Sequence, residues 1–273
     1  MIMKKTAIVL LTLALLLSGC SRDKNASPEP SAPAQQDGPQ MKTVYIRTGE
    51  TRITGDSETR TDYLLDDENR VCGVVMYTNG QQTQRYDVQC DENGNYIKWV
   101  SEDISSTYTY DQLGRSLGHI CYHGDTVTSS VKRIWAGQQL GELIVRNGSQ
   151  ETRTVYTYND EGHKIREELY QDGVLFSYSQ LSVDSDGLVT TQRVYQADGT
   201  QSATVSYAYE DKTVTATTTD PEGNVRQRKV EVYDEHNNLL ETALYDSDGQ
   251  LLSKETITWT PIQVPVSVQR ASI

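Results

Sequence analysis

The chain has 273 residues, a formal net charge of −13 and a mean hydropathy of −0.60. One Phe and three Trp stand beside 17 Tyr, so a deep core of Leu and Phe is not expected. Nucleic acid is excluded as a partner, because phosphate backbones are bound by Lys and Arg and the balance here is acidic. The negative net charge also argues against direct adsorption to anionic lipid headgroups.

Residues 1–19 have the layout of a secretory signal peptide. Two lysines precede an apolar run over residues 7–17, and Ser18 and Gly19 follow. The run is too short for a permanent transmembrane helix, which needs about 20 apolar residues. We therefore expect the signal to be removed.

The segment Leu17-Ser18-Gly19-Cys20 resembles the lipobox of bacterial lipoproteins. The resemblance implies that the thiol of Cys20 is acylated with diacylglycerol before the signal is cleaved. Two or three acyl chains give stable attachment to a membrane. The protein is thus expected at the extracytoplasmic face of a cell membrane, either on the cell surface or on the periplasmic side.

Residues 20–41 are predicted to form the anchor and a linker. Ser, Ala, Gln and Pro dominate this stretch, which holds four of the seven prolines. Such a composition cannot build a core. As a semi-extended spacer it would reach at most roughly 60 Å.

Residues 42–259 carry an internal repeat with a period of about 24 residues, which gives about eight repeats. One class of turn begins near Asp66, Asp91, Asp111, Ala136, Asn159, Asp184, Glu210 and Asp234. A second class is marked by Gly80, Gly124, Gly148, Gly173, Gly199, Gly223 and Gly249, with a member that lacks glycine at 101–103. Most of these glycines follow Asn or Asp, and Asn-Gly or Asp-Gly between strand-like runs indicates a type I′ hairpin turn.

Tyrosines alternate with small residues before several turns, as the period of two in a strand requires. The pairs are Tyr108 and Tyr110, Tyr156 and Tyr158, and Tyr207 and Tyr209. Further tyrosines precede the glycine turns at Tyr77, Tyr122, Tyr170, Tyr195 and Tyr245, and we expect tyrosines of successive repeats to stack in ladders. Helical periodicity is almost absent. The sequence predicts an all-β fold of tandem antiparallel hairpins with up to 16 strands.

An open twisted sheet of more than about ten strands usually curls or splits. The expected architecture is therefore an extended, curved or spiralling single sheet. Residues 260–273 are interpreted as a short C-terminal tail.

The run from Tyr108 to Arg115 resembles the YD repeats of the Rhs family, and weaker copies span 156–162 and 232–237. The similarity covers about residues 60–258. It implies strands of a large spiralling sheet and a surface location. In that family long arrays in secreted toxins wrap around a cargo. Because only a short segment follows Trp259, we expect no toxin domain here.

Three cysteines remain beside Cys20, namely Cys72, Cys90 and Cys121. Their spacing fits no zinc signature. Cys72 and Cys90 could bridge adjacent repeats, and three unpaired strand cysteines are the alternative.

The sequence favours a binding protein over an enzyme. It lacks the short catalytic and phosphate-binding motifs, and its four histidines have no motif-spaced nucleophile. No cofactor or metal is implied, since hairpin chemistry already explains the acidic turns that resemble calcium loops.

We expect a membrane-anchored surface lipoprotein that presents its repeats to an envelope or extracellular ligand, either a carbohydrate or a protein. The candidate contacts are Tyr108, Tyr110, Tyr156, Tyr158, Tyr207 and Tyr209, for which a purely structural ladder is the alternative. An architectural spacer or assembly partner in an envelope complex is the alternative function.

Overall fold

A computed structural model describes residues 40–266, which lie in the second of two compact units, Gly38–Ile273. The expected signal peptide, Cys20 and nearly all of the linker lie outside the described residues. The strands are β1 Met41–Thr54, β2 Ser57–Leu65, β3 Val71–Thr78, β4 Gln81–Cys90, β5 Tyr96–Ser101, β6 Ile104–Tyr110, β7 Ser116–His123, β8 Thr126–Ala136, β9 Gln139–Asn147, β10 Gln150–Tyr158, β11 Lys164–Gln171, β12 Val174–Val183, β13 Val189–Gln196, β14 Gln201–Glu210, β15 Thr213–Thr219, β16 Val225–Tyr233, β17 Leu239–Asp246 and β18 Leu251–Pro265. Every described element is a strand, so the all-β prediction is confirmed.

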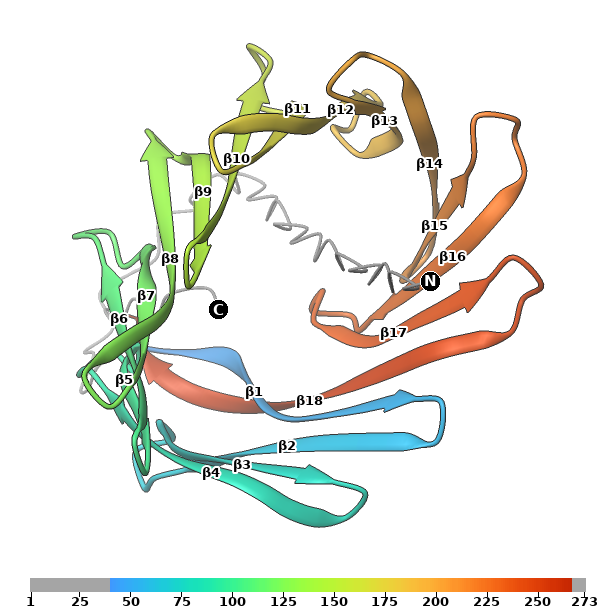
Figure 1. The fold of residues 1–273 in the computed structure, drawn as a ribbon. Coiled ribbons are helices and arrows are strands. Elements are labelled where there is room, and N and C mark those ends of the chain that lie inside the picture. The colour runs from blue at the N-terminus through green and yellow to red at the C-terminus, as the bar shows by residue number, and fades with distance from the viewer. Residues whose placement is uncertain (1–39, 267–273) are drawn as a thin grey trace, which may run out of the picture. The chain divides into compact units, whose positions relative to one another are not determined.

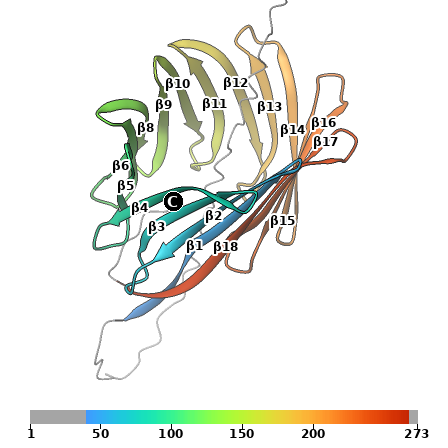
Figure 2. The same cartoon turned by 60° about the horizontal axis from the view of Figure 1, so that its bottom comes forward.

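The sheet closes on itself. Each strand pairs antiparallel with its neighbours in sequence, and β1 also pairs with β18 from Met41↔Pro265 to Thr54↔Ser253. Figures 1 and 2 show the resulting ring of strands. The predicted open sheet is therefore wrong, and the fold is a closed β-barrel of 18 strands. Closure pairs the N–H and C=O groups that two open edges would leave unpaired.

The seam of the barrel is built from strands that lie before the first and after the last of the marked turns. Residues 260–265, interpreted from the sequence as tail, continue β18 and pair with β1. The hairpin of β1 and β2 turns at Gly55-Asp56, a position that belongs to neither predicted class of turn. These segments raise the number of strands from the predicted 16 to 18.

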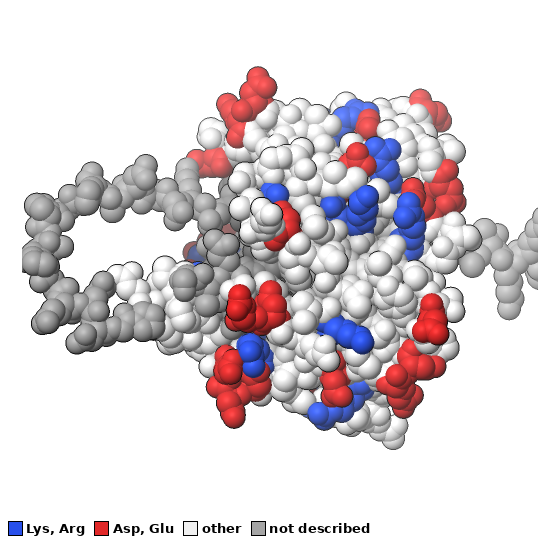
Figure 3. Space-filling view, turned by 90° about the vertical axis from the view of Figure 1, so that its left-hand side faces the viewer, with Lys and Arg blue, Asp and Glu red and all other residues white. Residues whose placement is uncertain are grey.

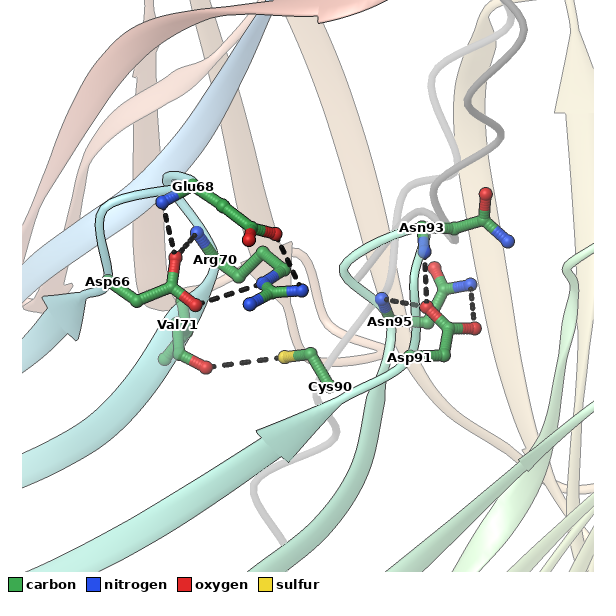
Figure 4. A network of polar contacts seen from close by, with 8 residues as sticks. All are labelled: Asp66, Glu68, Arg70, Val71, Cys90, Asp91, Asn93 and Asn95. Atoms are coloured by element: carbon green, nitrogen blue, oxygen red, sulfur yellow. Dashed lines mark hydrogen bonds and ion pairs between the residues drawn. The ribbon is translucent and has the colours of Figure 1, made fainter.

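Many turns share a five-residue form that begins with Asp or Asn. In the turn that begins at Asp91, the N–H groups of Asn93 and Asn95 donate to Asp91 Oδ1 over 2.9 and 2.8 Å. The fourth residue, Gly94, has a φ of 82°, a conformation that glycine adopts without strain. Figure 4 shows this turn beside the equivalent turn that begins at Asp66. The first carboxylate thus fixes the turn, which explains why Asp recurs there.

The second class of turn is mixed. Asn79-Gly80 and Asp172-Gly173 are two-residue turns with positive φ at both positions, as predicted for type I′. Asn147 instead pairs with Gln150, so that turn is Gly148-Ser149. The predicted glycines at positions 199, 223 and 249 lie in the longer form, because each N–H donates to the carbonyl three residues earlier.

The strand register defines two faces of the wall, and most of the buried side chains lie on one of them. Val74, Val88, Gln192, Glu231 and Ile257 lie on this face, each less than 10% exposed. Side chains on the concave side of a closed sheet converge, so this face is the inner wall and the other is the outer wall. The apolar core is a local cluster on β3–β6 around Val74, Val88 and Tyr96.

Candidate ligand-binding surfaces

The six tyrosines expected to contact ligand all lie on the inner wall. They belong to β6, β10 and β14, and three strands separate each pair from the next. The structure therefore does not bring them together into one site. Tyr108 instead joins an aromatic cluster, with its ring centroid 6.1 Å from that of Trp99 and 5.3 Å from that of His119.

Several of these tyrosines hold the wall together through their hydroxyls. Tyr158 donates to the carbonyl of Leu140 and Tyr209 to that of Val189, each over 2.9 Å. The Tyr207 hydroxyl donates to Gln192 Oε1 over 3.0 Å, and Gln192 Nε2 donates to Ser179 Oγ over 3.0 Å. Gln192 is 1% exposed, so this chain satisfies a buried amide. The contacts assign these rings a structural role.

Burial also sets the protonation of the inner tyrosines. It raises the pKa of Tyr108, Tyr110, Tyr156 and Tyr207 to about 12. Burial raises the pKa of Tyr158 and Tyr209 as well. At neutral pH these phenols are therefore protonated and are poor nucleophiles.

The outer wall carries a different set of tyrosines, two of which are capped by arginine. The guanidinium of Arg166 lies 4.3 Å from the ring centroid of Tyr178, and that of Arg153 lies 5.4 Å from the ring of Tyr170. Tyr178 also stacks on Tyr195 with ring centroids 4.9 Å apart and an interplanar angle of 13°. These cross-strand contacts run over β10, β11, β12 and β13.

Carboxylates fix the arginines of this surface. Arg153 Nε donates to Glu142 Oε2 over 2.7 Å, and Arg166 Nε donates to Glu168 Oε1 over 3.0 Å. The Tyr170 hydroxyl donates to the second oxygen of Glu168 over 3.0 Å. The side chains are thus ordered in advance, although pairs this exposed add little to stability.

An apolar residue stands beside this array. Phe176 is the only Phe of the chain, lies two residues before Tyr178 in β12 and is 54% exposed. Val174, two residues earlier, is 71% exposed. We call the following set the outer ladder: Arg153, Arg166, Tyr170, Phe176, Tyr178 and Tyr195.

Sequence reasoning found only part of the outer ladder. Tyr170 and Tyr195 were expected to stack because they recur before glycine turns, but Phe176 was missed. The sequence did contain a sign of it. The single Phe of the chain comes shortly after a turn, at a position where hairpins usually carry polar residues.

Charge is segregated between the ends and the walls of the barrel. The turns after the even-numbered strands hold 13 carboxylates and three Lys or Arg, a net of −10. Those after the odd-numbered strands hold nine carboxylates and, within residues 40–266, no Lys or Arg. The strands themselves hold 17 Lys or Arg and 13 carboxylates, a net of +4. Figure 3 shows cations and carboxylates interspersed on one side of the wall.

The remaining cysteines are thiols rather than a disulfide. Cys90 Sγ donates to the carbonyl of Val71 over 3.3 Å, as Figure 4 shows. Cys121 accepts a hydrogen bond from Ser106 Oγ over 3.3 Å, and Cys72 is exposed. The possible bridge between Cys72 and Cys90 is therefore not formed.

Residues 40–266 contain no helix with the length and apolar character needed to cross a membrane. In the same range no three His, Cys, Asp or Glu side chains form a group that could hold a metal ion.

Comparison with known proteins places the chain in a family. The family described as "Uncharacterised protein" matches residues 48–198. This match spans more than half of the chain, so the chain belongs to that family. No curated protein matches it.

Similarity to solved structures is distant. The chain resembles a porin-like protein from Bacteroides vulgatus ATCC 8482 at 11% identity and a TM-score of 0.36, covering 78% of this chain and 98% of that one. A porin-like protein from Bacteroides uniformis ATCC 8492 gives 9% identity and a TM-score of 0.28, with 78% and 96% covered. TcdB2-TccC3-Cdc42 gives 12% identity and a TM-score of 0.32, with 71% of this chain but only 14% of that chain covered.

Proposed function

We propose that this protein is a lipid-anchored, non-catalytic binding protein of the bacterial cell envelope and that its outer ladder binds a protein partner. The observation that carries the proposal is the row of arginine-capped tyrosines beside the exposed Phe176. Tyr, Phe and Arg are enriched in protein interfaces, and Tyr and Arg are enriched among their hot spots.

The geometry of the outer ladder favours a protein over a sugar as its ligand. A sugar stacks on an open ring face, but Tyr178 has Arg166 on its ring and Tyr195 stacked against it. The ring of Tyr170 is likewise capped by Arg153. Because cross-strand contacts already hold these side chains, ordering them on binding costs little entropy.

The charge distribution supports the same surface. Both ends of the barrel are strongly acidic, whereas the walls are slightly cationic. A partner that carries apolar side chains and a few carboxylates would be repelled by the acidic ends of the barrel and could bind to the wall. We therefore propose such a partner, with its carboxylates opposite Arg153 and Arg166.

The anchor is proposed from the sequence motif at Cys20, and the walls are proposed to face water. Arg153, Arg166 and Arg193 project from the middle of outer-wall strands. An Arg or Lys that faces hydrocarbon at mid-membrane costs about 2–4 kcal/mol. The barrel is thus proposed to stand beside the membrane on its linker, held by lipid alone.

A relationship to the Rhs family stays a proposal that rests on the Tyr108–Arg115 motif.

Site-specific photo-crosslinking in the native bacterium tests the proposal. A photoreactive amino acid replaces Phe176 in one strain and Ile120, a 38% exposed outer-wall residue of β7, in a matched control. We expect one protein to crosslink at position 176 and not at 120. After purification that protein should bind the wild-type chain and bind Arg166→Glu at least about tenfold more weakly.

Equal crosslinking at both positions, or equal affinity for Arg166→Glu, would contradict the proposal. The experiment also addresses the architectural alternative. A partner that co-purifies at fixed stoichiometry in every preparation would make the chain an assembly component instead of a receptor for a free ligand.

A further inference from the structure

The hairpin of β5 and β6 is shorter than the strands around it, so the barrel wall extends less far at this point. β5 and β6 have six and seven residues, whereas β4 has 10 and β8 has 11. β4 pairs with β5 only from Asp87 to Cys90, so the earlier part of β4 stands above the short hairpin. The difference in length leaves a hollow on each side of the tip at Glu102-Asp103.

The first hollow lies on the outer wall between β5 and β7 and has a volume of about 280 Å³. Register places Lys98 opposite Thr107, and Ser105 opposite Tyr122, on this face. Asp125 completes the lining from the next turn. The hollow thus combines one aromatic ring with hydroxyls, an ammonium and a carboxylate.

The second hollow lies at the end of the wall between β4 and β5 and has a volume of about 420 Å³. Gln84 and Ser101 line it from the inner face, and Arg85, Asp87 and Val100 line it from the outer face. Its lining is almost entirely polar and includes Gln82, Gln84, Arg85, Asp87, Ser101 and Glu102. Within it Gln84 Nε2 donates to Ser101 Oγ over 3.0 Å, which leaves the carbonyl of this amide to accept from a ligand.

The hollows adjoin across the short hairpin. Val100, which lines the second hollow, pairs directly with Ser105, which lines the first. The backbone N–H of Gly124 donates to the carbonyl of Asp103 over 2.6 Å, and Nε2 of His123 contacts the carboxylate of the same Asp103. These contacts hold the tip of the hairpin against the turn that follows β7, so the two hollows keep a fixed spacing.

We infer that the two hollows form one trough that binds an uncharged oligosaccharide. Side-chain hydroxyls and amides at five or more positions can exchange hydrogen bonds with sugar hydroxyls. The ring of Tyr122 supplies an amphipathic contact at low entropic cost. Two cations, Lys98 and Arg85, face three carboxylates in the lining, so no net positive charge selects an acidic sugar.

The trough is independent of the outer ladder. It lies on β4–β7, while the outer ladder lies on β10–β13, and the two sets share no residue. Failure of one site therefore does not imply failure of the other. Both together would let the barrel hold a glycan and a protein at once.

Calorimetric titration of the whole exported chain with three probes tests the inference. The probes are cellohexaose and chitohexaose, which are uncharged, and hexagalacturonate, which is anionic. We expect at least one uncharged probe to bind, with hexagalacturonate binding more weakly. Tyr122→Ala should weaken binding at least about tenfold, and Tyr245→Ala on β17, outside both the trough and the outer ladder, should leave it unchanged.

A second variant guards against loss of folding in Tyr122→Ala. Asp125→Lys changes an exposed turn residue and should also weaken binding, with an unchanged circular dichroism spectrum. The inference is overturned if none of the uncharged probes binds at millimolar concentration. It is also overturned if hexagalacturonate binds best, or if both trough variants bind like the wild type.

Discussion

The hydroxyl of Tyr158, near the end of β10, donates to the carbonyl of Leu140 at the start of β9 over 2.9 Å. Tyr209, Trp135 and Trp259 make the same kind of bond to the first residue of the preceding strand. These aromatic residues therefore tie neighbouring strands together at one end of the barrel.

Tyr158→Phe removes this donor and keeps the ring. A buried hydrogen bond contributes about 1 kcal/mol, so we expect the free energy of unfolding in urea to fall by about that amount. Tyr195→Phe on the outer wall is the control and should change stability by no more than about 0.5 kcal/mol. Equal effects of the two changes would argue against a structural role for the inner hydroxyls.

Gly118 of β7 is required by close packing. Its φ is +144°, and a Cβ added there would lie 1.9 Å from the carbonyl oxygen of Val131. We expect Gly118→Ala to destabilise the barrel by more than about 3 kcal/mol, because backbone of β8 must move. Gly124→Ala also has a positive φ but open space around the added Cβ, and should cost about 1 kcal/mol. Thermal unfolding that ranks the two variants the other way would contradict this packing.

The buried tyrosines predict alkaline unfolding. Burial raises the pKa of Tyr108, Tyr110, Tyr156 and Tyr207 from 10 to about 12. Since the folded chain holds these protons more tightly than the unfolded chain, their contribution to stability is complete below pH 10 and is lost as the pH rises to 12. Phenolate absorbance should increase together with loss of the strand signal in circular dichroism. Titration of all tyrosines near pH 10 in a folded chain would show that they are not buried.

The lipid anchor predicts how the chain partitions in the cell. Cys20→Ser removes the thiol that the lipobox resemblance assigns to acylation. We expect the variant to lose incorporation of a labelled fatty acid and to leave the membrane fraction. Unchanged membrane association would mean that another part of the chain holds it there.

Local features of the fold could be predicted from the sequence, because hairpin turns depend on few residues. Asp91, Asn93 and Gly94 fix their turn through contacts within five positions, so the residue types alone indicate it. The alternation of Tyr108 and Tyr110 likewise places both rings on one face. It does not say whether that face is inside or outside, because this depends on how the whole sheet curves.

Closure could not be predicted, because the two strands that make it lie before the first and after the last marked turn. β1 precedes the first marked turn, and residues 260–265 of β18 contain Pro261 and Pro265 and were interpreted as tail. Both prolines lie within the paired register of β1 and β18. The outer ladder could not be predicted either. Arg153, Tyr170 and Tyr178 belong to three different strands, and only the register between these strands places them on one surface.

A disulfide trap tests whether the sheet closes between β1 and β18. Thr51 and Thr256 are direct partners across the seam. In a chain whose native thiols are replaced by serine, Thr51→Cys with Thr256→Cys should form an intramolecular disulfide in high yield, and Thr51→Cys with Arg193→Cys should form none. An open sheet would hold positions 51 and 256 roughly 80 Å apart at about 4.8 Å per strand. Absence of the 51–256 bridge in a folded chain would contradict the closed barrel.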